Sequence, residues 1–110
     1  MPIETSQLES GITVVTVSGR LVLGVDEERL ETVVNELLEQ ERKKIVFDIS
    51  ALDYADSSGI GTLVACLTHI KNASGDLRMA GANQRMRRLF RMTGVDSLMS
   101  LYPTVSEATE

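Results

Sequence analysis

The stretch VFDISALDYADSSGIGTLV, Val46–Val64, joins two elements through a short polar loop. Its first part belongs to the nearly unbroken apolar run KKIVFDIS, which predicts a strand covered on both faces. Its last part begins an apolar stripe with helical spacing, which predicts a helix. The stripe consists of Ile60, Leu63, Val64, Leu67 and Ile70. The stretch therefore predicts a strand, a loop and a helix, with two adjacent serines where the helix begins.

Signals on both sides of this stretch continue the alternation of strands and helices. Before it, we expect a short strand over residues 3–8, a strand over Gly11–Leu21 and a helix over residues 25–40. After it, we expect a strand over residues 77–81, a helix over 83–94, a strand within 97–102 and a short final helix. Asn83 is expected to cap the 83–94 helix, Gly94 to end it, and Thr104–Glu107, TVSE, to open the final helix with capping-box spacing. The order predicts a single α/β domain over residues 1–110, a mixed sheet of about four or five strands with helices packed on it.

Composition and charge narrow the class of protein. The chain has 110 residues, 43% apolar and 25% charged, which is typical of a globular domain that can bury a core. Its formal net charge of −5 disfavours nucleic-acid binding, which depends on Lys and Arg at phosphates. No basic or apolar leader opens the sequence and no apolar run approaches the roughly 20 residues of a membrane span, so we expect a cytoplasmic protein without a membrane segment. The single cysteine, Cys66, is typical of a reduced thiol packed in a helix.

The loop over Asp53–Gly61 allows two interpretations. In the first, Ser57 or Ser58 only caps the helix by accepting a hydrogen bond from a backbone N–H group, which contributes about 1 kcal/mol. In the second, a serine hydroxyl is displayed there to be modified. Gly59 and Gly61 are expected to keep the first turn slim, so that another chain can approach it. The loop lacks the Gly-Lys-Ser/Thr of a P-loop and the third glycine of a dinucleotide fingerprint.

Together with two other segments, this stretch resembles the STAS domain of bacterial anti-sigma factor antagonists. In that family Asp-Ser-Ser/Thr-Gly-Leu/Ile-Gly opens a helix after a strand and a short loop, as DSSGIG does here at residues 56–61. The resemblance extends to GRL at Gly19–Leu21 and to RMRRLFRMTGVDSLMSLY at residues 85–102, and it covers most of the chain. One departure is Val22, which stands where many members of the family have an acidic residue.

The resemblance implies a partner-switching mechanism. The free antagonist binds an anti-sigma factor that is also a serine kinase, and so releases a sigma factor. The kinase phosphorylates the first serine after the aspartate, here Ser57, and a metal-dependent serine phosphatase resets the protein. Asp56 would flank the phosphate and Ser58 would stay unmodified, within an implied partner-binding segment of Asp56, Ser57, Ser58, Gly59, Ile60 and Gly61. The resemblance implies a mainly monomeric binding module in transcription regulation, with a dimer as the alternative, and not an enzyme; no cofactor, metal, nucleic acid or membrane is implied.

Rival hypotheses stay open from the sequence. A STAS protein can also be a scaffold that assembles with copies of itself or with a sensor complex, or a small subunit of a lipid-transport complex that leaves Ser57 unmodified. A third rival, of a different class, is an enzyme or nucleotide-binding domain, which predicts stabilisation by ATP or GTP alone.

Several other side chains have two interpretations each. Asp48, Asp53 and Asp56 are either solvated acids of a loop and strand end or a magnesium or acid–base cluster. His69 is the only histidine, which is too few for a metal site built on several imidazoles. The last set is a group of arginines that forms either a solvated helix face or an electrostatic contact with an acidic partner: Arg85, Arg87, Arg88 and Arg91.

Overall fold

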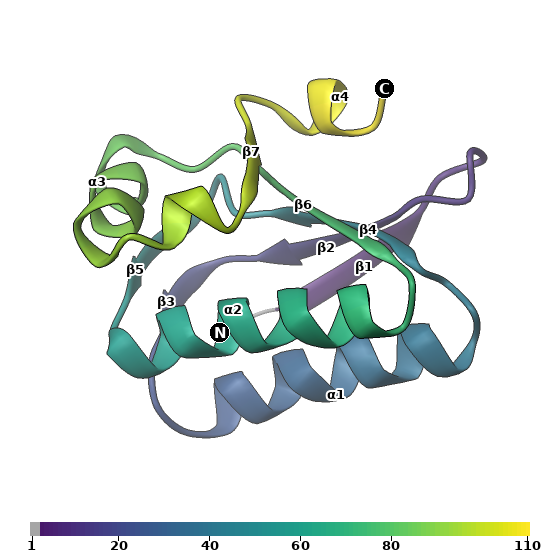
Figure 1. Ribbon diagram of the computed structural model, residues 1–110, viewed down its shortest axis with the longest axis horizontal. Coiled ribbons are helices and arrows are strands. Elements are labelled where there is room, and N and C mark those ends of the chain that lie inside the picture. The colour runs from purple at the N-terminus through teal and green to yellow at the C-terminus, as the bar shows by residue number, and fades with distance from the viewer. Residues whose placement is uncertain (1–2) are drawn as a thin grey trace.

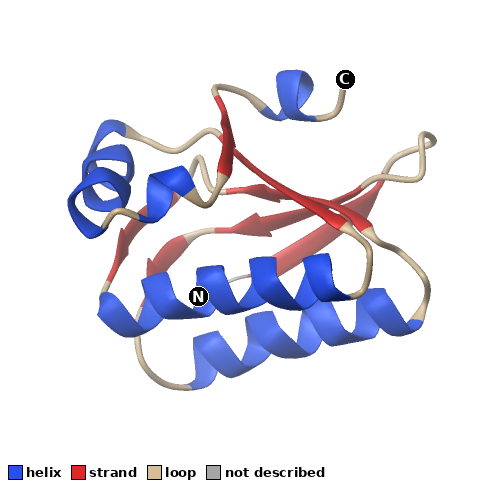
Figure 2. Ribbon diagram, viewed as in Figure 1, coloured by secondary structure: helices blue, strands red, loops and turns tan. Residues whose placement is uncertain are grey.

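A five-stranded mixed sheet forms the centre of the molecule, with strand order β1-β2-β4-β6-β7 and a separate two-stranded sheet of β3 and β5. The computed structural model describes residues 3–110, apart from the side chain of residue 26. Figures 1 and 2 show α1 and α2 packed along one face of the large sheet, α3 at the end of the molecule where β3 and β5 lie, and α4 over the opposite face. The predicted mixed sheet with helices packed on it is confirmed.

The elements follow one another in nearly strict alternation after an initial hairpin. The strands are β1 (Ile3–Gln7), β2 (Thr13–Val17), β3 (Gly19–Leu21), β4 (Lys44–Asp48), β5 (Leu52–Ala55), β6 (Asp76–Ala80) and β7 (Ser100–Tyr102). The helices are α1 (Val25–Glu39), α2 (Ser57–Asn72), α3 (Gln84–Thr93), the 3₁₀ turn η1 (Val95–Ser97) and α4 (Val105–Ala108).

The sheet is mixed because its first pair is a hairpin and the others are joined by helices. β1 and β2 pair antiparallel, whereas β2, β4, β6 and β7 run parallel to one another. Parallel neighbours need long crossover connections, and α1, α2 and α3 lie in those connections. The register places Val15 opposite Phe47 and Phe47 opposite Met79, so these buried side chains form one row on the face that α1 and α2 cover.

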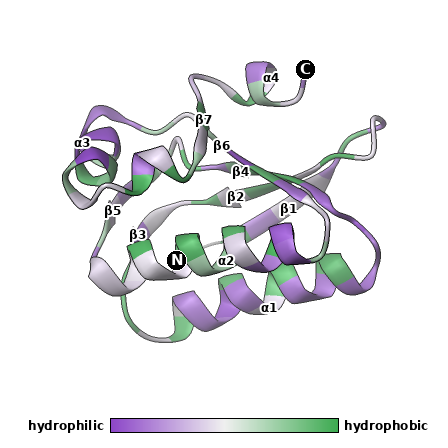
Figure 3. Ribbon diagram, in the orientation of Figure 1, coloured by the Kyte–Doolittle hydropathy of each residue, from purple (hydrophilic) through white to green (hydrophobic). Residues whose placement is uncertain are grey.

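Two apolar clusters hold the layers together. The larger one lies between the sheet and α1 and α2, and it extends to Met86 and Phe90 of α3. The smaller one lies on the opposite face, where Ala108 of α4 packs with Val14 and Val46. Figure 3 shows hydrophilic residues along the outer turns of α1 and α3. None of the described helices is long and apolar enough to cross a membrane.

The single strand expected over Gly11–Leu21 is wrong, because the structure divides it into β2 and β3. Gly19 has φ of +81°, and β3 leaves the large sheet to pair in parallel with β5. The first residues of the expected Asp53–Gly61 loop are not a loop but part of β5, Leu52–Ala55. Leu52 and Ala55 are fully buried, so pairing with β3 supplies the backbone hydrogen bonds that this buried segment requires.

Candidate functional site

Asp56 caps α2, so the first of the two interpretations, in which Ser57 or Ser58 only caps the helix, is wrong. One carboxylate oxygen of Asp56, Oδ1, accepts a hydrogen bond from the Gly59 N–H at 2.7 Å, which is the bond of an N-cap side chain. The other, Oδ2, accepts from the Leu23 N–H at 3.3 Å. Asp56 therefore ties the start of α2 to the loop that follows β3.

Because Asp56 satisfies the helix start, the hydroxyl of Ser57 is left for solvent. Ser57 is the first residue of α2 and is exposed. Within residues 3–110, its side chain makes no hydrogen bond to another group of the chain. Ser58 is half-buried, and its carbonyl oxygen accepts from Thr62 Oγ1 at 3.1 Å. Of the two serines, Ser57 is the one that the fold displays.

The two glycines of the motif have different structural roles. Gly59 is buried, and a side chain there would collide with the carbonyl oxygen of Leu21 and lie 3.2 Å from Ala55 Cβ. Gly59 therefore lets α2 approach β3, so the expectation that it opens the first turn to another chain is wrong. Gly61 is exposed, and no neighbouring group lies within 4 Å of the position that a Cβ would occupy, as that expectation requires. Ile60 is only 4% exposed and packs in the core.

The connection from β3 into α1 carries two exposed apolar side chains, and sequence reasoning missed them. Leu23 is 76% exposed and Val25 is 70% exposed, although leucine and valine are residue types that are most often buried. The Asp56 N–H donates to the Leu21 carbonyl at 3.3 Å, and the Leu23 N–H donates to the Asp56 carboxylate, so the loop is held beside the start of α2. The available signal was a pair of apolar residues at the entry to the acidic helix, Leu23 in the loop and Val25 at the first position of α1.

The remaining candidate side chains are not assembled into a site. Asp48 accepts from the Ser50 hydroxyl at 2.7 Å, whereas Asp53 is exposed. Among the described residues, no three or more His, Cys, Asp and Glu side chains are grouped so that they could hold a metal ion. Burial, with a smaller contribution from the charge of Glu31, raises the pKa of Cys66 to about 12, so this thiol is protonated at neutral pH and is a poor nucleophile.

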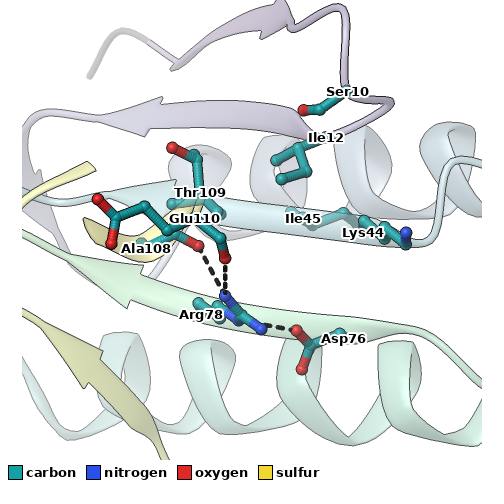
Figure 4. A pocket seen from close by; sticks show the side chains of 10 residues that line it. Ser10, Ile12, Lys44, Ile45, Asp76, Arg78, Ala108, Thr109 and Glu110 are labelled. Carbon is teal, nitrogen blue, oxygen red and sulfur yellow. Dashed lines mark hydrogen bonds and ion pairs between the residues drawn. The ribbon is translucent and has the colours of Figure 1, made fainter. Parts of the chain in front are cut away.

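A depression of about 300 Å³ lies between α4 and the β1–β2 hairpin (Figure 4), and none of residues 56–61 lines it. Arg78 of β6 donates to the carbonyl oxygens of Ala108 at 3.0 Å and Glu110 at 3.4 Å, and pairs with Asp76 at 3.0 Å. The guanidinium also lies over the ring of Tyr102, 5.3 Å from its centroid. Arg78 is thus engaged in fastening the C-terminal segment to the sheet.

The fold and the helix start together define the class of protein. The large mixed sheet, the separate β3–β5 pair and the Asp-Ser-Ser-Gly start of α2 agree with a STAS domain, and the STAS domain family model matches residues 5–108. The chain belongs to the STAS domain family.

Individual members of the family are about 30% identical to this chain over most of its length. A Staphylococcus aureus protein named anti-sigma-B factor antagonist is 31% identical over 81 residues, which are 74% of this chain and 71% of that protein. A Thermotoga maritima relative is 30% identical over 78 residues, 71% of this chain and 69% of its own length.

Solved structures share the fold. A Thermotoga maritima crystal structure superposes with a TM-score of 0.87 at 21% identity, covering 97% of this chain and 91% of that one. The anti-sigma factor antagonist SpoIIAA in its unphosphorylated form superposes with a TM-score of 0.74 at 16% identity, covering 98% of this chain and 94% of that one. The Bacillus cell fate determinant SpoIIAA in its phosphorylated form gives 0.74 at 19% identity, covering 98% and 96%.

Proposed function

We propose that this STAS protein is an anti-sigma factor antagonist whose binding to its anti-sigma factor is switched by phosphorylation of Ser57. The observation on which the proposal rests is the free, exposed Ser57 hydroxyl at the start of α2, directly after the capping carboxylate of Asp56. A curated relative that is named anti-sigma-B factor antagonist supports the choice of partner. The protein acts as a binding module and kinase substrate in the cytoplasm, and not as an enzyme.

The covalent step is a phosphoryl transfer performed by the partner. The Ser57 oxygen attacks the γ-phosphorus of ATP, the bond to the β-phosphate oxygen breaks and ADP leaves, while a base of the kinase takes the hydroxyl proton. A metal-dependent serine phosphatase resets the protein by adding water across the phosphorus–oxygen bond, which releases inorganic phosphate. This chain supplies an accessible oxygen that no internal hydrogen bond in its described part holds back.

The position of Ser57 suits a charge switch. A phosphate adds about −1.5 to −2 charges at neutral pH, and the N-terminus of a 16-residue helix tolerates that charge inside the monomer. A packed partner surface does not tolerate that charge, because in the complex the phosphate is stripped of water beside the negatively charged Asp56 carboxylate. A hundredfold loss of affinity requires only about 2.7 kcal/mol, which one buried phosphate can supply.

The surface around Ser57 combines polar and apolar contacts. Of the segment expected to bind the partner, Asp56, Ser57, Ser58 and Gly61 are at least partly accessible, whereas Gly59 and Ile60 are buried and hold α2 against β3. Leu23 on the adjoining loop and Val25 at the first position of α1 have exposed side chains, and we assign them to the apolar part of this surface. The family's usual acid near this loop is replaced by Val22, so the partner meets an apolar loop here.

The test uses purified antagonist, its anti-sigma factor and Mg-ATP. Mass spectrometry is expected to find one phosphate on Ser57, and Ser57→Ala is expected to remain unphosphorylated while binding the anti-sigma factor normally. Ser58→Ala is the matched control and is expected to be phosphorylated like the unchanged protein. Ser57→Asp is expected to weaken binding.

Two outcomes would contradict the proposal. Phosphate on another residue, or on none, would remove Ser57 as the acceptor. Undiminished binding by the phosphorylated protein would remove the switch and favour a scaffold or transport subunit, in which the serine stays unmodified.

A further inference from the structure

The exposed side of α3 carries four positive charges close together. Four arginines lie on this 10-residue helix, which has no acidic residue, in a protein whose formal net charge is −5. All four are exposed, and within residues 3–110 none forms an ion pair or a hydrogen bond through its side chain. They are Arg85, Arg87, Arg88 and Arg91.

This arrangement is unfavourable for the isolated helix. Arg87 and Arg91 are four residues apart, and Arg88 and Arg91 are three apart, so like charges are neighbours on the helix surface. The fold itself needs only the opposite side of α3, where Met86 and Phe90 are fully buried. The positive side therefore adds repulsion without contributing to the core, and an external anionic group would relieve it.

Apolar side chains and hollows accompany the positive charge. Arg87, Arg91 and Leu101 line a depression of about 390 Å³ together with Gln84 and Asp96. Arg87 and Leu101 also line a second depression of about 320 Å³. Met92 is 78% exposed and Leu98 is 53% exposed on the same helix and the turn after it. Arg and Met are enriched in protein interfaces and Lys and Glu are depleted, so this composition favours a protein partner over a purely solvated surface.

This surface and Ser57 lie at the same end of the molecule. α3 packs against β5, and β5 leads directly into Asp56 and Ser57 (Figure 1). The molecule measures only 33 × 29 × 24 Å, and a standard interface buries about 800 Å² on each partner. The α3 surface and the Ser57 region can therefore both fall within the interface with one partner protein.

We propose that the α3 surface formed by Arg87, Arg91 and Leu101 is a second contact for the anti-sigma factor and binds an acidic patch with an apolar residue at its centre. This inference rests on the proposed function and extends its interface from the Ser57 region to α3. The acidic patch accelerates association, because the opposite charges attract each other before the apolar contacts form.

The test compares two charge-matched double variants of the full chain. Arg87→Gln with Arg91→Gln removes two charges from α3, and Lys44→Gln with Lys71→Gln removes two from the start of β4 and the end of α2. Both change the formal net charge from −5 to −7, since each replaces two basic residues. Glutamine is as good a helix former as arginine, so α3 is expected to stay folded, which circular dichroism checks.

Association with the purified anti-sigma factor is measured by stopped flow at about 10 mM and 150 mM salt, where the Debye length is about 30 Å and 8 Å. The α3 variant is expected to associate about tenfold more slowly at low salt and to lose most of its salt dependence. The lysine variant is expected to stay within about twofold of the unchanged protein.

Equal behaviour of the two variants would overturn the α3 contact while leaving the proposed function intact. Absence of any binding by the unchanged protein would overturn both. Salt-dependent binding of a DNA duplex that only the α3 variant loses, with unchanged association to the anti-sigma factor, would assign the arginines to nucleic acid and also overturn the inference.

Discussion

Replacing Asp56 with alanine removes two hydrogen bonds that organise the site. The carboxylate accepts from Gly59 N at 2.7 Å and from Leu23 N at 3.3 Å. Loss of an N-cap costs about 1 kcal/mol, and the longer bond to the loop is expected to add about 0.5 kcal/mol. Asp56→Ala should therefore lower the free energy of unfolding by about 1.5 kcal/mol, or the melting temperature by roughly 6 °C in a domain of this size.

Urea unfolding followed by circular dichroism measures this change, with three comparison variants. Asp56→Asn keeps a capping oxygen and is expected to lose about 0.5 kcal/mol or less. Ser57→Ala and Ser58→Ala are expected to change stability by less than about 0.5 kcal/mol, because the first removes an exposed hydroxyl and neither removes the cap. A cost for either serine variant as large as that for Asp56→Ala would show that a serine caps α2 and would refute the assignment.

Two further predictions concern the core around the site. Gly59→Ala places a methyl group against the Leu21 carbonyl oxygen and is expected to lower the free energy of unfolding in urea by about 3 kcal/mol. Gly61→Ala fills open space on the same helix and is expected to raise the free energy of unfolding by up to about 1 kcal/mol. Equal effects of the two substitutions would contradict the close approach of α2 to β3. Burial, and to a smaller extent the charge of Glu31, raises the pKa of Cys66 from 9.0 to about 12. Above pH 9 the thiol therefore loses its proton in the unfolded state while it stays protonated in the folded state. The free energy of unfolding is expected to fall by about 1.4 kcal/mol per pH unit up to about pH 12. Cys66→Ala is expected to remove this part of the alkaline decline in unfolding curves at pH 9 to 11, and an unchanged slope would contradict the burial of the thiol.

Features that depend on a few neighbouring residues could be predicted from the sequence. Asn83 caps α3 by accepting from the Met86 N–H at 2.8 Å, and Gly94 ends that helix with φ of 76°, so both predictions are confirmed. Thr104 Oγ1 accepts from the Glu107 N–H at 3.1 Å, which confirms the predicted start of α4. Each of these signals is complete within four residues of chain, and the hydrogen bond it predicts involves only those residues.

Features that depend on distant pairing could not be predicted in this way. The division between β2 and β3 requires Gly19–Leu21 to pair with Leu52–Ala55, which lies more than thirty residues further along the chain. The same pairing makes the first residues of the expected Asp53–Gly61 loop part of β5. The identity of the cap was also ambiguous, because Asp and Ser are nearly equal as N-cap residues. The Asp56 carboxylate also accepts a hydrogen bond from the Leu23 N–H, 33 residues away, and this contact, which favours Asp56 as the cap, exists only in the folded chain.

The arrangement at Asp56 also bears on how a switch at Ser57 would operate. Within the described residues, the Ser57 hydroxyl holds no other part of the chain, so adding a phosphate breaks no internal hydrogen bond. The cap at Gly59 and the bond to the loop of Leu23 both belong to Asp56 and remain available after the modification. Under the proposed mechanism the free energy of switching therefore comes from the partner interface, where the phosphate must be desolvated beside a carboxylate, and not from refolding of this domain. If a serine capped its own helix, its phosphorylation would change both the stability of the monomer and the affinity of the complex. The effect on binding could then not be separated from an effect on folding.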